Sequence, residues 1–122
     1  MRAFWVSLIL AGLMLAGIGI NYIYINDVSD ELYRQLDAMP DAEAPNCIMA
    51  ANALCEYWEK HVDIVGLSVS YTIVDRLSEQ AATLVACAEC GDFYGFRTAL
   101  ALTRDAVGDM RRLETFSIGN LF

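Results

Sequence analysis

The sequence is poor in the residues on which most enzymes and metal sites depend. It contains a single histidine, His61, which lies among charged residues and is expected on a solvated helix surface. No serine is framed by a glycine elbow, and no glycine-rich phosphate loop is present. These absences lead us to expect a protein that is not an enzyme and that holds neither a cofactor nor a metal ion.

Basic residues and prolines are also scarce. Eight Lys and Arg stand against sixteen Asp and Glu, giving a net charge of -8, which would repel the phosphates of nucleic acids. Nucleic acid is therefore excluded as an expected partner. The two prolines, Pro40 and Pro45, lie close together and predict one loop that interrupts otherwise helical sequence.

What the chain does have is a long apolar run, Ala3 to Ile25, without a charged residue. As a helix it would be roughly 34 Å long, enough for a hydrocarbon core of about 30 Å. A cleaved signal peptide is the alternative, with Gly17 and Gly19 as small residues for the cleavage site. Because the run continues apolar through Ile25, we expect an uncleaved anchor in the cell membrane, in contact with the lipid bilayer.

The flanks of this run predict its orientation. Arg2 and the α-amino group precede it, and Asp27, Asp30 and Glu31 follow it, so the positive-inside rule places the N-terminus in the cytoplasm and the rest of the chain outside. Within the run, three small residues recur on one helix face: Gly12, Ala16 and Gly19. They could pack against another membrane helix, including that of a second copy of the chain, or they could reflect only the general abundance of Gly and Ala in membrane spans.

The remaining sequence predicts an all-α fold. Val28, Leu32 and Leu36 recur at helical spacing and indicate an amphipathic stalk and loop over residues 27–45, after an anchor over residues 1–26. Three further helical patterns over residues 46–122 predict a small antiparallel three-helix bundle with a C-terminal tail. Residues 67–73 alternate apolar and polar like a strand, but they lack a second strand to pair with and are interpreted as a corner between helices.

The four cysteines leave several alternatives open. Cys87 and Cys90 have C-x-x-C spacing, but Cys47 and Cys55 would lie about 12 Å apart along one helix, which disfavours a shared zinc ion. If the second and third predicted segments form a hairpin, Cys47 lies level with Cys87 and near Cys90, so a disulfide could form outside the cell. Reduced cysteines within the core are the other main interpretation.

The pattern as a whole resembles a family. A single N-terminal span, the segment Cys55 to Lys60 with its tryptophan, the Gly91-Asp92-Phe93 corner and the ending Arg112 to Phe122 are similar to clostridial membrane-anchored proteins of domain of unknown function 4363. The resemblance implies a Firmicute membrane protein, often encoded beside a multi-span protein of the YetF-like group. It implies no activity.

We therefore expect a non-enzymatic, single-pass accessory protein that presents an acidic helical bundle to a multi-span membrane partner. The closing residues form a possible partner-binding tail, made of Phe116, Ile118, Asn120, Leu121 and Phe122. The alternative is an envelope module that senses a small ligand or signal between its helices.

Overall fold

The computed structural model describes the backbone of residues 1–67 and 69–121, and the side chains of residues 1–67 and 69–113. This part of the chain is helical and contains no strand, so the predicted all-α class is confirmed. The helices are α1 (Arg2–Asp37), α2 (Cys47–Val65), α3 (Tyr71–Cys90) and α4 (Phe93–Leu121). Of the alternating segment, Leu67, Val69 and Ser70 lie between α2 and α3, and residues 71–73 form the first turn of α3.

The helix ends follow from local sequence signals. The loop between α1 and α2 contains both prolines, and α3 ends at Gly91, whose φ of 75° is a left-handed conformation that glycine adopts without strain. Asp92 then caps α4, because its Oδ1 accepts a hydrogen bond of 3.0 Å from the amide of Gly95. Asn46 precedes α2 as expected, but its side chain makes no capping hydrogen bond.

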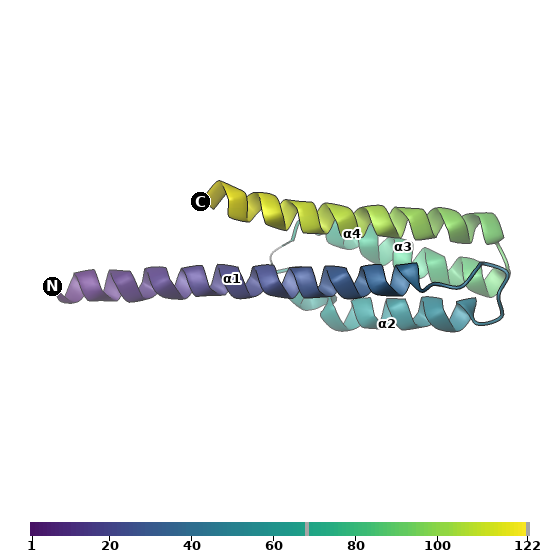
Figure 1. Ribbon diagram of the computed structural model, residues 1–122, viewed down its shortest axis with the longest axis horizontal. Helices are drawn as coiled ribbons and strands as arrows, with labels where there is room; N and C mark the ends of the chain where they lie inside the picture. The colour runs from purple at the N-terminus through teal and green to yellow at the C-terminus, as the bar shows by residue number, and fades with distance from the viewer. Residues whose placement is uncertain (68, 122) are drawn as a thin grey trace.

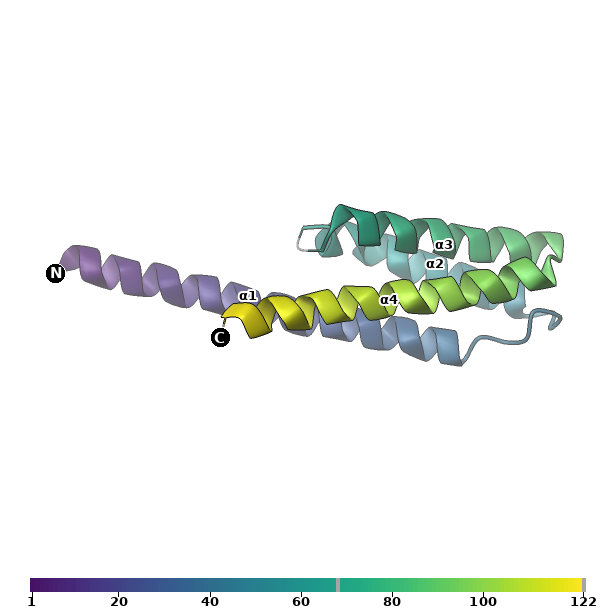
Figure 2. The ribbon, with the colours of Figure 1, turned by 90° about the horizontal axis from the view of Figure 1, so that it is seen from above.

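The four helices lie roughly along one axis, and consecutive helices run in opposite directions (Figures 1 and 2). Helix α1 packs against α2 and α4, and α3 packs against the same two helices. The N-terminal half of α1 projects beyond the other helices, so that one end of the molecule is a single helix for much of its length (Figure 1).

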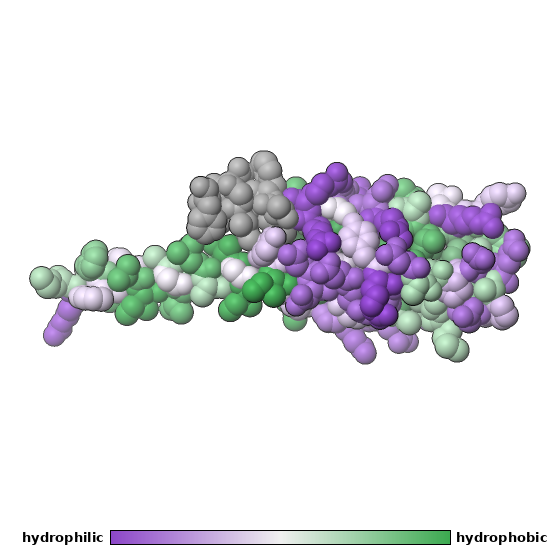
Figure 3. Space-filling view, viewed as in Figure 1, coloured by the Kyte–Doolittle hydropathy of each residue, from purple (hydrophilic) through white to green (hydrophobic). Residues whose placement is uncertain are grey.

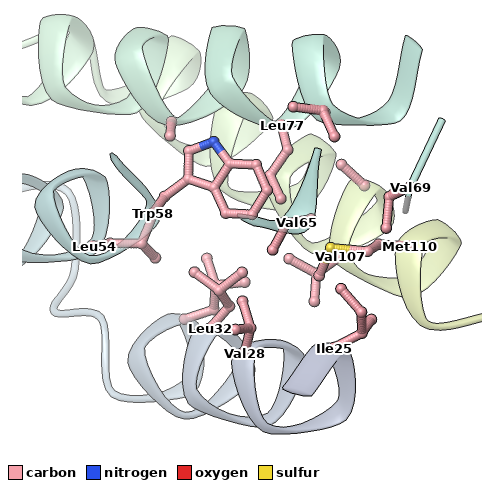
Figure 4. Packing of buried hydrophobic residues seen from close by; sticks show 14 residues of the cluster. Ile25, Val28, Leu32, Leu54, Trp58, Val65, Val69, Leu77, Val107 and Met110 are labelled. Carbon is pink, nitrogen blue, oxygen red and sulfur yellow. The ribbon is translucent and has the colours of Figure 1, made fainter. Parts of the chain in front are cut away.

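The expected stalk is replaced by a fourth bundle helix. Ile25, Val28 and Leu32 are buried in the main core together with Trp58 and Met110 (Figure 4). The number of helices agrees with the expected span-and-stalk helix followed by three more, but the second half of α1 packs into the core with the other three helices. The physical reason is that the apolar face of residues 25–36 is wide enough to complete the core between α2 and α4.

Two ion pairs between α1 and α4 show how these helices are aligned. Arg104 reaches Asp37 at 2.5 Å, and Arg111 reaches Asp30 at 2.7 Å. The Nε of Arg111 also donates to Oδ1 of Asn26 at 3.1 Å. Such exposed pairs each stabilise a fold by only about 0–1 kcal/mol, but they report which residues lie level with one another.

A further ion pair on α1 predicts an unusual titration. The pKa of Glu31 is lowered to about 2, first because Arg34 donates to its carboxylate at 2.5 Å and then because Gln35 also donates to it. A lowered pKa means that the folded state is stabilised above pH of about 4.3 and loses this contribution as the pH falls through about 2. We expect NMR of the side-chain carboxyl carbon to show this midpoint, and Arg34→Gln to move it upward. An unchanged midpoint in that variant would assign the shift to another cause.

Candidate functional site

The most distinctive surface is the projecting half of α1. Most of its large apolar side chains are exposed, and they form a hydrophobic rod that extends from the polar surface of the bundle (Figure 3). By length and composition, α1 is apolar enough to cross a membrane, and no residue of its most apolar stretch is buried within the protein. We call residues 3–25 the apolar segment.

The small residues of the apolar segment lie open. A Cβ atom added to Gly12 or Gly19 would meet nothing within 4 Å, and Ala16 is exposed. The predicted packing face therefore contacts no other described part of the same chain.

Cys47, Cys87 and Cys90 lie near the end of the bundle opposite the apolar segment, and Cys55 lies midway along α2. Cys47 is buried in a cluster with Leu84 and Phe96, and Cys87 packs against this cluster from α3. Cys90 is exposed and Cys55 is half-buried on α2. All four are free thiols, so the structure brings Cys47 and Cys87 into one neighbourhood without joining them to each other or to Cys90.

The thiols of Cys55 and Cys87 are poorly suited to nucleophilic chemistry. Burial raises the pKa of Cys55, and the nearby carboxylate of Glu59 raises it further. Burial also raises the pKa of Cys87, with Asp92 as the next cause. Because the thiolate is the reactive and metal-binding form, both groups are held in the less reactive state near neutral pH. Among the described residues, no three His, Cys, Asp or Glu side chains are grouped so as to hold a metal ion.

His61 is more enclosed than the sequence indicated. Its ring lies 4.3 Å from that of Tyr57 and 6.0 Å from that of Tyr24, measured between ring centroids. Its Nδ1 lies 2.8 Å from the carbonyl oxygen of Tyr57. The i, i+4 spacing of Tyr57 and His61 was the available signal, since such residues are neighbours on a helix surface. Only the packing of α1 against α2 adds Tyr24 to this aromatic cluster.

A shallow groove among the described residues bears on the alternative of small-ligand binding. It lies between α1 and α2, has a volume of about 230 Å³, and is lined by Arg34, Gln35, Ala38, Ala50 and Ala53. Ligand pockets usually enclose roughly 300–1,000 Å³ and bury most of the ligand surface. This groove offers one guanidinium group and little enclosure. It is therefore a weaker candidate for the functional site than the apolar segment.

The C-terminal tail begins within the helical part of the chain. Helix α4 continues through Leu121, whereas the apolar closing residues were expected to form a tail after the last helix. The side chains of Phe116, Ile118, Asn120 and Leu121, and all of Phe122, lie outside the described residues. Their role as a partner-binding surface stays a prediction.

Comparisons with protein-family models, with curated proteins and with solved structures found no match for this chain. The resemblance to domain of unknown function 4363 therefore also stays a prediction, and the site is defined by geometry: an exposed apolar segment joined without interruption to an acidic four-helix bundle.

Proposed function

We propose that this chain is a non-enzymatic, single-pass membrane protein that presents its helical bundle to a multi-span membrane partner. The observation that carries the proposal is the apolar segment, which is exposed over nearly its whole length while the same helix enters the core at Ile25. In water, an exposed apolar rod of this size is unfavourable, whereas a bilayer is the solvent that it matches.

The flanking charges support one orientation. Arg2 lies at the free end of the apolar segment, and the acidic residues Asp27 and Asp30 lie where α1 joins the bundle. The positive-inside rule then places the N-terminus in the cytoplasm and the bundle outside the cytoplasmic membrane.

The end of α4 supports a partner surface next to the membrane. Because Arg104 pairs with Asp37 and Arg111 pairs with Asp30, α4 runs antiparallel to α1 and approaches the apolar segment as its numbering increases. Both ribbon views place the last turns of α4 beside the projecting half of α1 (Figures 1 and 2). We propose that these two helical segments together receive a membrane helix of the partner.

A co-purification experiment tests this proposal. The tagged full-length chain is extracted from its native membrane in mild detergent, and we expect a multi-span protein to accompany it, with the YetF-like group as the first candidate. Deleting residues 116–122 should abolish that association, because it removes the end of α4 beside the apolar segment.

The matched control changes the opposite end of the same helix. Tyr94 is a large exposed aromatic residue near the start of α4, far from the apolar segment, so Tyr94→Ala should leave the association intact. Equal loss in both variants would show a general effect on the bundle. Unchanged association after the deletion would contradict the assignment of the partner surface.

A further inference from the structure

The corner between α2 and α3 exposes large apolar side chains that the bundle does not use. Ile64, Leu67 and Tyr71 have exposed fractions of 52%, 85% and 77%. We call these three residues the apolar corner. They lie at the end of the bundle from which the apolar segment of α1 projects (Figure 1).

Contacts with α1 show where the apolar corner lies along the long axis of the molecule. Tyr24 contacts His61 near the end of α2, and Ile25 lies at the same end of the core cluster as Val69, which is between Leu67 and Tyr71 in the chain (Figure 4). The corner is therefore level with the last residues of the apolar segment. No stalk separates the two, because the helix that leaves the apolar segment is already part of the core at Ile25.

Three backbone amides on the α2 side of the corner are hydrogen-bonded within the chain. The amide of Gly66 donates to the carbonyl of Val62 at 2.8 Å, and the amide of Val69 donates to that of Val65 at 3.0 Å. The amide of Leu67 likewise donates to the carbonyl of Ile64 at 3.2 Å. These three amides need no hydrogen bond from water, which lowers the cost of bringing this part of the turn toward a bilayer.

We propose that the apolar corner is a second membrane contact, which rests in the headgroup layer of the bilayer and seats the bundle directly on the lipid surface. This inference rests on the proposed membrane span, because the span sets the height of the corner. Tyr71 fits such a site because tyrosine favours the boundary between lipid and water. The expected surface is zwitterionic, since a chain with a net charge of -8 is repelled by anionic headgroups.

NMR of the full-length chain in phosphatidylcholine nanodiscs tests the proposal. A nitroxide placed near the lipid headgroups should erase the amide signals of Leu67 and Tyr71, whereas a water-soluble gadolinium chelate should leave them. Met49, which is 76% exposed at the other end of α2, should show the reverse. Equal broadening of Leu67 and Met49 by the chelate would overturn the proposal.

The same spectra separate this inference from the span on which it rests. Leu13, in the middle of the apolar segment, should be shielded from the chelate if α1 spans the bilayer. If Leu13 is shielded and the corner is not, the span stands and the corner proposal fails. If the chelate reaches Leu13 as well, both proposals fail.

A charge substitution adds an independent readout. Leu67→Asp should move the corner into water, so that its amide signals are lost with the chelate and kept with the nitroxide lipid. Because Leu67 is exposed, the fold should be unaffected. Met49→Asp introduces the same charge at the distal end and should leave the spectra of the corner unchanged. Persistent lipid contact in Leu67→Asp would contradict a role for its side chain.

Discussion

Replacing Trp58 with alanine is expected to lower the free energy of unfolding by about 3–5 kcal/mol. Trp58 is the largest fully buried side chain and lies in the core between Leu54 and Leu77 (Figure 4). Its Nε1 also donates a hydrogen bond of 2.8 Å to Oγ of Ser78, which ties α2 to α3. Truncation removes both the apolar contacts and this bond, and would leave a large cavity.

Urea unfolding of the detergent-solubilised chain, followed by far-UV circular dichroism, measures this loss. The sequence supplies its own control, because Trp5 is the other tryptophan and lies exposed in the apolar segment. Trp5→Ala should leave the midpoint of bundle unfolding unchanged. A similar midpoint for Trp58→Ala and Trp5→Ala would show that the core is not organised around Trp58.

Leu32→Ala should destabilise the bundle by about 2–5 kcal/mol. Leu32 is fully buried and lies on α1 beside Val28, facing the core that α2 and α4 complete (Figure 4). This substitution tests the most consequential difference between the expected and the observed fold. If residues 27–37 were a stalk outside the bundle, truncating Leu32 would have almost no effect on unfolding.

The matched substitution lies on the same helix. Leu13 is 65% exposed in the apolar segment, so Leu13→Ala removes the same atoms from a site with no core contacts. We expect its unfolding midpoint to equal that of the unmodified chain. If Leu32→Ala behaved like Leu13→Ala in the urea experiment, the second half of α1 could not be a bundle helix.

The local features of the fold were accessible from the sequence. Prolines 40 and 45 mark the one long loop, and Gly91 with Asp92 marks the corner where α3 ends and α4 begins. The apolar positions of α2 and α3 recur at helical spacing, and the structure buries Trp58 and Leu84 among them. These features depend on interactions between residues within one or two helical turns of each other, so a short stretch of sequence is enough to predict them.

The candidate site was accessible only in part. The apolar segment was found because a long uncharged run is a property of the sequence itself. The aromatic cluster around His61 was missed because Tyr24 and Tyr57 come from different helices. The corner between α2 and α3 was predicted from the sequence. Its position beside the end of the apolar segment was not, because that position depends on how α1 packs against the other helices.

The sequence by itself determined that this chain is helical, acidic and apolar at its N-terminus, because these properties follow from composition and local periodicity. Only the tertiary structure showed that the first half of α1 projects from the bundle while its second half is one of the four bundle helices. The periodicity of residues 25–36 gives an apolar face but not its neighbour, and burial against α2 and α4 is a contact between distant segments.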